Sequence, residues 1–188
     1  MPILTIVSEW WTYTPGLFNP DLFPHLYTEI SNLCGSYKVT VYGKEYDSKR
    51  MSCYISSSDH DLGYNGMLSF DWTVVPIISE IRTVIEKFLE TKYDYCLVHI
   101  YRDGNDNIGW HNDKEALDSD IASVSFGATR KFRFRKIGQT TGFAEEILLN
   151  NGDLVHMKIG CQRRFKHCVP VEKKVKNPRI NLTFRKYE

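Results

Sequence analysis

The chain has 188 residues, of which 42% are hydrophobic and 13% aromatic, which suits one domain with a sizeable core and is too little for two. Its 24 basic residues nearly balance 23 acidic ones, so the summed charge does not by itself indicate a nucleic-acid or membrane partner. The five cysteines include no C-x-x-C pair, which argues against a zinc or dithiol redox site and favours reduced thiols in an intracellular protein.

The N-terminal half predicts two helices and no targeting segment. The first residues lack a basic start and a long apolar run, and no apolar run approaches the ~18 residues of a membrane span, so we expect a soluble, unprocessed chain. A first helix should begin at Asn19-Pro20 and reach Cys34, because apolar residues recur at helical spacing between them. A second should begin at Pro76 and end near Lys92. We expect both helices to pack on a sheet.

From Tyr95 onward the chain changes to short runs rich in β-branched and aromatic residues, separated by turn signals such as Asn151-Gly152. Two helices followed by many short strands indicate an α+β fold whose sheets close as a jelly roll. No repeat, linker or low-complexity tract marks a boundary, so we treat residues 1–188 as one domain. The predicted strands are 95–101, 121–126, 131–137, 146–149, 153–157, 165–169 and 179–185.

Candidate metal ligands occur at His111 and Asp113, directly after the turn-rich segment 103–109. If the backbone is extended there, side chains two residues apart point to the same side and can share one ion. His167, far along the chain, offers a third ligand. Two histidines and one carboxylate on one face of an ion leave its other positions open, as in non-haem Fe(II) oxygenases. Taken singly, H-x-D and a distant histidine are also ordinary surface features.

The segment 179–185 reads as a strand with one polar and one apolar face. Arg179, Asn181, Thr183 and Arg185 share the polar face. Two arginines that point inward need carboxylate partners, and a dicarboxylate such as 2-oxoglutarate offers bidentate hydrogen bonds. The alternative is an edge strand whose arginines face water.

Together, His111-Asn112-Asp113, His167 and the segment 179–185 resemble the H-x-D, H and R-x-N-x-x-x-R signature of the AlkB family. The similarity extends over about residues 39–186. Within that family, the segments 101–104, 121–128 and 181–186 are most similar to the duplex-preferring animal DNA repair branch. The resemblance implies a double-stranded β-helix fold in which His111, Asp113 and His167 bind Fe(II).

The resemblance also implies a set of contacts with 2-oxoglutarate. Arg179 is expected at the distal carboxylate, Arg185 near the metal-bound end, and Tyr101 at a hydrogen bond with the cosubstrate. One departure is His99, because the family usually has asparagine at this position. A histidine can still donate a hydrogen bond, although a core histidine is the alternative reading. The expected cosubstrate contacts are His99, Tyr101, Arg179, Asn181, Thr183 and Arg185.

The activity implied by the resemblance is oxidative demethylation of N-alkylated bases such as 1-methyladenine and 3-methylcytosine in DNA. In this reaction 2-oxoglutarate is decarboxylated to succinate and CO2, and formaldehyde is released. Glu115 resembles an acidic position that contacts the damaged base, where a carboxylate would favour a cationic ring. The alternative is a solvent-facing loop residue.

A base in a duplex must be turned out of the helix to reach a buried site, which requires a stacking surface and a wedge. Tyr64 resembles the aromatic residue that packs on the flipped base, and Tyr42 the finger that enters the duplex. Both would belong to a nucleotide-recognition lid at about residues 37–68, beside a catalytic core at about residues 93–187. Alternatively, both tyrosines are ordinary sheet residues.

Three basic clusters, at residues 49–50, 130–136 and 173–176, are candidate phosphate contacts or simply solvated surface. A dioxygenase of the same fold that acts on RNA or on a protein side chain would keep the same iron and 2-oxoglutarate signature. A binding module without catalysis is a weaker alternative, because none of the three metal ligands is replaced. We expect a monomer, located in the nucleus of a eukaryotic cell or otherwise in the cytoplasm, with no membrane partner.

Overall fold

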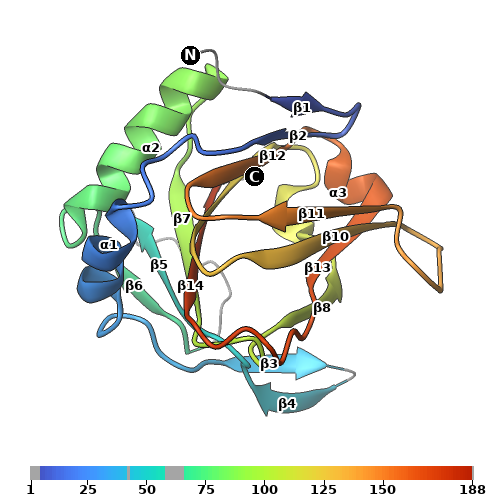
Figure 1. Cartoon of the computed structure of the whole chain (residues 1–188), viewed down its shortest axis with the longest axis horizontal. Coiled ribbons are helices and arrows are strands. Elements are labelled where there is room, and N and C mark those ends of the chain that lie inside the picture. Colours follow the sequence, from blue (N-terminus) through green and yellow to red (C-terminus); the bar gives the residue numbers. More distant parts are fainter. Residues whose placement is uncertain (1–4, 42, 58–65, 188) are drawn as a thin grey trace.

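Two β-sheets face each other in the computed structural model, which describes residues 5–41, 43–57 and 66–187 (Figure 1). The larger sheet has the strand order β1 (Ile6–Val7), β2 (Trp11–Thr14), β12 (Asp153–Met157), β9 (Ile121–Gly127), β14 (Arg179–Arg185), β7 (Tyr95–Tyr101), β5 (Met51–Ser56) and β6 (Leu68–Phe70). The smaller sheet has the order β11 (Glu145–Leu149), β10 (Arg130–Lys136), β13 (Phe165–Val169) and β8 (Ile108–His111). A separate hairpin pairs β3 (Lys38–Val41) with β4 (Lys44–Asp47).

Two facing sheets whose strands pair mainly in antiparallel fashion form a jelly roll, which confirms the predicted α+β fold. Both predicted helices, α1 (Leu22–Ile30) and α2 (Pro76–Leu89), lie on the outer face of the larger sheet, away from the smaller one (Figure 1). No helix in the described part of the chain is long and apolar enough to cross a membrane.

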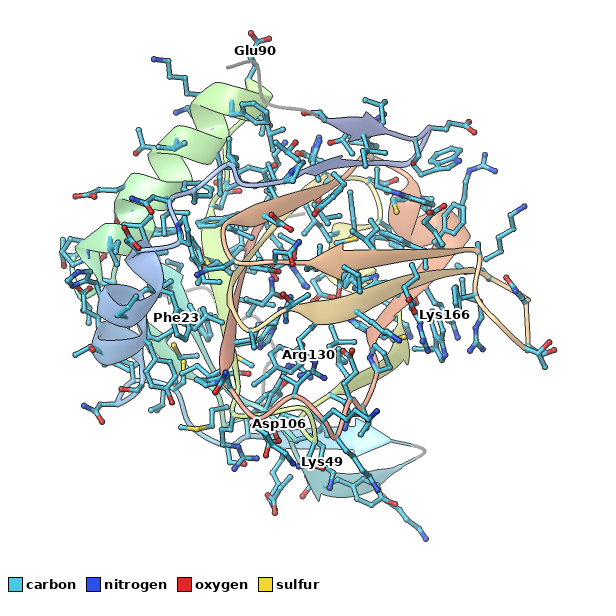
Figure 2. The ribbon with its side chains drawn as sticks, in the orientation of Figure 1. Phe23, Lys49, Glu90, Asp106, Arg130 and Lys166 are labelled. Atoms are coloured by element: carbon cyan, nitrogen blue, oxygen red, sulfur yellow. The ribbon has the colours of Figure 1, made fainter. Side chains whose placement is uncertain are left out.

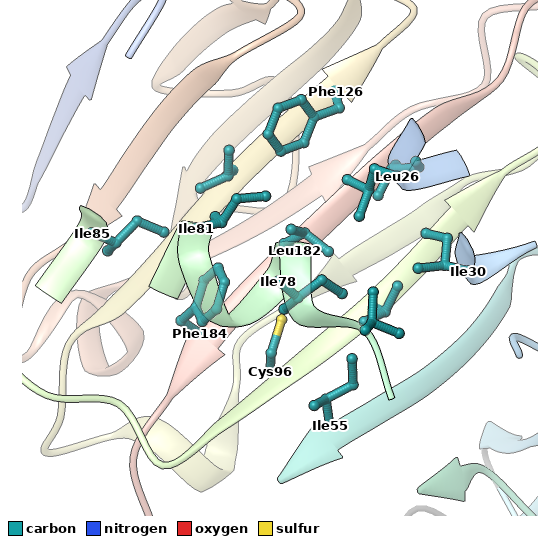
Figure 3. Packing of buried hydrophobic residues seen from close by; sticks show 14 of the residues in the cluster. Leu26, Ile30, Ile55, Ile78, Ile81, Ile85, Cys96, Phe126, Leu182 and Phe184 are labelled. Carbon is teal, nitrogen blue, oxygen red and sulfur yellow. The ribbon is translucent and has the colours of Figure 1, made fainter. Parts of the chain in front are cut away.

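The helices pack on the larger sheet through a buried apolar cluster, which explains how the central strand β14 is oriented. Ile180, Leu182 and Phe184 of this strand are each 0% exposed and face the helices. Because side chains alternate along a strand, the polar residues between them must point into the space between the two sheets. Figure 3 labels ten members of the cluster: Leu26, Ile30, Ile55, Ile78, Ile81, Ile85, Cys96, Phe126, Leu182 and Phe184.

A second apolar cluster lies between the two sheets and is rich in aromatic side chains. Trp11 of β2 stacks on Phe134 of β10, with ring centroids 4.1 Å apart and planes 8° apart, and Phe165 meets the same Trp11 ring edge-on. Large rings bury much apolar area and hold a defined spacing between the layers. The inward-pointing polar side chains of β14 lie in the same interior as this second cluster.

The predicted helices and strands are all present and differ from the observed ones at their ends, whereas the strands β1 to β6 and β8 were not predicted. The first helix is shorter than predicted at both ends. The N–H of Asp21 binds the Asn19 side chain in a turn before the helix starts at Leu22, and the helix ends at Ile30, whose carbonyl accepts the N–H groups of Leu33 and Cys34. The second helix starts at Pro76 as predicted and ends at Leu89, where Glu90 adopts the left-handed conformation with φ 54°. All seven predicted strands are confirmed within one residue at each end.

The segment predicted as a recognition lid contains elements of two kinds. The β3–β4 hairpin forms a sheet of its own, whereas β5 pairs along its whole length with β7 in the larger sheet. Tyr42 and Tyr64, the predicted base contacts, lie outside the described residues. All five cysteines are free thiols and buried.

Candidate active site

Three predicted metal ligands converge at the edge of the smaller sheet. His111 is the last residue of β8, and His167 lies directly opposite it on β13. Asp113 follows in the loop after β8. The ligand atoms of the three side chains all lie within 4.8 Å of one another, with His111 Nε2 at 3.7 Å and His167 Nε2 at 3.5 Å from the Asp113 carboxylate. This spacing fits a single shared ion.

The Asp113 carboxylate supports the same conclusion, because its Oδ2 atom is buried and has no hydrogen-bond partner among the described residues. A buried carboxylate oxygen without a donor is unfavourable unless a cation occupies the space beside it. Two imidazoles and one carboxylate form the donor set that non-haem Fe(II) sites use. The residues present therefore fit Fe(II).

The surroundings of the three side chains favour the protonation states that bind a metal, which are the neutral imidazole and the ionised carboxylate. Burial lowers the pKa of His167 to about 3 and also lowers the pKa of His111, so both imidazoles are neutral at neutral pH. Although burial raises the pKa of Asp113, Arg185 and the two histidines lower it well below its ordinary value. The Gly109 carbonyl, 2.8 Å from His111 Nδ1, can only accept a hydrogen bond, so Nδ1 carries the ring proton and Nε2 keeps its lone pair for a metal.

Gln162, which sequence reasoning missed, holds the loop that carries Asp113. It lies in the short helix α3 (Cys161–Arg164) and is 1% exposed. Its side-chain oxygen accepts the backbone N–H of Asp113 at 3.0 Å, and its backbone carbonyl accepts the Asn112 amide at 3.0 Å. The local sequence around Gln162 gives no sign of this role. Its two partners lie about 50 residues earlier, and the basic residues that follow it are typical of an exposed segment.

We expect Gln162→Ala to weaken Fe(II) binding by about 10- to 100-fold, the usual loss when a group that orients a metal ligand is removed. Gln162→Glu retains an acceptor for the Asp113 N–H and should lose less. Titration of each metal-free variant with Fe(II) under nitrogen measures its Fe(II) affinity. Equal metal affinity in Gln162→Ala and the unmodified protein would show that the loop holds Asp113 without this contact.

The predicted cosubstrate residues line up on the inner faces of β14 and β7. In the register of these strands, Arg179 pairs with Tyr101, Asn181 with His99, and Arg185 with Tyr95. All seven residues of β14 are buried, and the strand lies between β9 and β7, so the alternative of a solvated edge strand is wrong. The wall of a cavity of about 210 Å3 includes His99, Tyr101, His111, Asp113, His167, Asn181, Thr183 and Arg185.

Arg179 is 1% exposed and lies beside Tyr101, with its guanidinium carbon 4.9 Å from the ring centroid. One nitrogen donates to Ser125 Oγ at 2.9 Å, but Nε and Nη1 have no hydrogen-bond partner in the part of the chain that the structure describes. Burial lowers the pKa of Arg179 to about 10. A buried cation with two unused donors points to an anionic ligand, although Arg179 itself is not part of the cavity wall.

Arg130, labelled in Figure 2, is as deeply buried as Arg179. Unlike those of Arg179, its three side-chain nitrogens all donate to described residues. It donates to the Glu172 carboxylate at 3.1 Å and to the backbone carbonyls of Asp103, Asp106 and Pro170. Arg130 was predicted, with residues 131–136, as a candidate phosphate contact, and for Arg130 this prediction is wrong because its side chain is 1% exposed. Its side chain joins the loops around β8 and β13 from inside.

Arg185 and Glu115 connect the metal ligands to the cavity wall. The Arg185 guanidinium lies 3.0 Å from Asp113 Oδ1 and also donates to Glu115 Oε1. Glu115 lies on the turn 114–116, its side chain is 41% exposed, and it lines the cavity.

Asn181, a predicted cosubstrate contact, donates to Ser123 Oγ and to the Val124 carbonyl at 2.9 Å, so its amide is already engaged with β9.

A jelly roll that carries two histidines, a carboxylate and a buried unpaired arginine in one interior defines a non-haem Fe(II) oxygenase site. Residues 11–185 match the model of the 2OG-Fe(II) oxygenase superfamily, and the chain belongs to this superfamily of enzymes. This membership confirms the predicted class of enzyme and implies that the chain uses Fe(II) and 2-oxoglutarate.

The chain is similar to the DNA oxidative demethylase ALKBH2 of Bos taurus, with 32% identity over 88% of this chain and 63% of that protein. It is 33% identical to ALKBH2 of Mus musculus over 88% of this chain and 73% of that protein. The chain therefore spans about two thirds of the length of these relatives. The solved structure of OsALKBH1 shares the fold, with a TM-score of 0.64 and 18% identity over 99% of this chain and 100% of that one.

Proposed function

We propose that this chain demethylates N-alkylated bases in DNA, using Fe(II) and 2-oxoglutarate. The observation that carries the proposal is that His111, Asp113 and His167 meet at a cavity whose wall includes Tyr101, and that Arg179 lies over the Tyr101 ring with Nε and Nη1 lacking a hydrogen-bond partner among the described residues. The similarity to ALKBH2, a DNA oxidative demethylase, supports DNA as the substrate class.

When bound, Fe(II) and 2-oxoglutarate would supply the oxidation of the N-alkyl group, with release of succinate, CO2 and formaldehyde. The chain's own residues bind and orient the reactants. His111, Asp113 and His167 would hold the metal from one side. Arg179 would pair through Nε and Nη1 with one carboxylate of the cosubstrate, and Tyr101, packed beside it, would donate a hydrogen bond to the same molecule. Arg185, held by Asp113, would lie close to the metal-bound end.

Burial of the metal ligands restricts how the substrate can approach. Asp113 and His167 are each 5% exposed, so a base that reacts there must leave its stack and enter the cavity. Glu115 lies at this cavity and would attract a cationic ring such as 1-methyladenine or 3-methylcytosine. The stacking role of Tyr64 and the wedge role of Tyr42, and with them the preference for duplex DNA, are part of this proposal. We further propose that the protein acts as a monomer inside the cell.

The proposal is tested by mass spectrometry of a duplex oligonucleotide that carries one 1-methyladenine. We expect loss of one methyl group that depends on both Fe(II) and 2-oxoglutarate. The same lesion in single-stranded DNA and in RNA, assayed in parallel, measures the preference for duplex DNA. If the protein binds Fe(II) and 2-oxoglutarate but leaves all three oligonucleotides unchanged, the proposed substrate is wrong and a protein side chain becomes the next candidate.

A further inference from the structure

Ser52 and His99 form a buried hydrogen-bonded pair at the cavity. The proposed roles of the metal ligands and the arginines do not account for this pair. They lie opposite each other on the paired strands β5 and β7, and Ser52 Oγ is 2.7 Å from His99 Nδ1. Ser52 is 1% exposed and His99 is 7% exposed. His99 lines the cavity, and Asn181 of β14 pairs with it on the other side. The ring therefore lies in the row of inward-facing residues, next to the pair formed by Arg179 and Tyr101.

The hydrogen bond between these two residues has only one favourable direction. Apart from His99 Nδ1, the Ser52 hydroxyl has no hydrogen-bond partner among the described residues. If Nδ1–H donated to Ser52 Oγ, the hydroxyl proton would be buried without an acceptor, which is unfavourable. If the hydroxyl donates to Nδ1, both groups are satisfied. The ring proton of a neutral His99 then lies on Nε2, the nitrogen that Ser52 does not use.

We infer that Ser52 fixes His99 as its Nε2–H tautomer and so makes it a hydrogen-bond donor to the anionic cosubstrate in the cavity. This inference rests on the proposed use of 2-oxoglutarate. Ser52 is thus a positioning residue, because it acts on the ligand through His99. In the opposite tautomer, Nε2 would present a lone pair to a carboxylate, so the position of one proton decides between attraction and repulsion.

The groups around His99 are consistent with a neutral donor. Burial lowers the pKa of His99 well below its ordinary value, and the positive charges of Arg50, Arg185 and Arg179 lower it further. A neutral imidazole has two tautomers, and some neighbour must select one of them. An amide always carries an N–H donor, whereas a neutral imidazole carries one on only one of its two nitrogens. The dependence on Ser52 is therefore expected for histidine at this position and not for asparagine.

The tautomer is measured directly by long-range 1H–15N correlation spectra of the metal-free protein, with His99 assigned from the His99→Asn variant. We expect a single Nε2–H tautomer in the unmodified protein and a mixture of tautomers in Ser52→Ala. An Nδ1–H tautomer in the unmodified protein overturns the inference. An unchanged Nε2–H tautomer in Ser52→Ala also overturns it, because the selection would then not depend on Ser52.

The consequence for binding is measured as the 2-oxoglutarate affinity of the Mn(II)-loaded protein. Ser52→Ala should weaken binding by roughly ten-fold, the range expected for one hydrogen bond to a charged group. Ser52→Thr, which keeps the hydroxyl, should restore it, and Ser56→Ala, which removes a buried hydroxyl opposite Tyr95 on the same strand, is the matched control. In a His99→Asn background, Ser52→Ala should have no further effect. Equal losses in both backgrounds overturn the inference.

The failures of this inference and of the proposed function give different results. If the unmodified Mn(II) protein does not bind 2-oxoglutarate, the proposed cosubstrate is wrong, and the inferred donor role falls with it. If it binds 2-oxoglutarate and Ser52→Ala binds equally well, the inference alone is wrong.

Discussion

Asp113→Ala should abolish 2-oxoglutarate-dependent turnover while leaving DNA affinity largely unchanged. Asp113 is the single carboxylate among the three candidate ligands, and its buried Oδ2 has no hydrogen-bond partner within the described residues. Removing it leaves two neutral imidazoles, which bind Fe(II) far more weakly than a site that also supplies an anionic oxygen. The loss should exceed the ~100-fold expected for an outer group that only orients a ligand. Arg185 still has Glu115 as an ion-pair partner, so we expect the variant to fold.

The measurement is succinate formation with and without the methylated oligonucleotide, together with Fe(II) binding and DNA affinity. Asp118→Ala is the matched control, because Asp118 is an exposed aspartate five residues away that pairs with Arg163. It should turn over 2-oxoglutarate at the normal rate. Unchanged turnover in Asp113→Ala would contradict the assignment of the metal site.

Part of the metal site could be predicted from short-range signals, whereas His167, far along the chain, was linked to His111 and Asp113 by the resemblance to the AlkB family. The H-x-D spacing places His111 and Asp113 on one side of an extended segment, and the alternation in β14 separates three apolar residues from four polar ones. The structure shows both patterns, since Ile180, Leu182 and Phe184 lie against the helices. Each pattern depends only on neighbouring residues and on the geometry of a strand.

Hydrogen-bonded pairs of residues far apart in the sequence could not be predicted where no resemblance marked them. Ser52 and His99 are 47 positions apart, and Gln162 and Asp113 are 49 apart, so no local pattern marks either pair. The strand β5 was also missed as a strand, because it is covered on both faces. Cys53 and Ile55 pack into the helix-side core while Ser52 contacts His99, and the apolar and polar alternation is therefore weak.

The partners of the two buried arginines, Arg130 and Arg179, could not be predicted from the sequence either. Their different surroundings lead to a prediction for a pair of variants. Arg130 and Arg179 are both 1% exposed and both lie over the Tyr101 ring. Arg130 has partners for Nε, Nη1 and Nη2, whereas Nε and Nη1 of Arg179 have none among the described residues. Those partners, such as Glu172, lie 24 to 42 positions away in sequence. Replacing each arginine with methionine, which has similar length but no charge, should therefore have opposite effects on stability and on cosubstrate binding.

Arg130→Met should lower the free energy of unfolding by about 3–5 kcal/mol, because it removes the cation that pairs with Glu172 and binds the carbonyls of Asp103, Asp106 and Pro170. Arg179→Met removes a buried cation whose Nε and Nη1 have no hydrogen-bond partner in the part of the chain that the structure describes, so the free energy of unfolding should stay the same or rise. In contrast, Arg179→Met should weaken 2-oxoglutarate binding by about 2–5 kcal/mol, or roughly 30-fold and more. Arg130→Met should bind 2-oxoglutarate nearly normally at temperatures where it is folded.

Urea denaturation and calorimetric titration of the Mn(II) protein with 2-oxoglutarate measure the two quantities for each variant. The predicted result is a crossed pattern, in which one variant loses stability and the other loses the cosubstrate. If Arg179→Met is instead the less stable variant and binds 2-oxoglutarate normally, the unpaired nitrogens of Arg179 have a structural role. The carboxylate of 2-oxoglutarate must then be bound by another cation of the site, of which Arg185 is the nearest to the metal ligands.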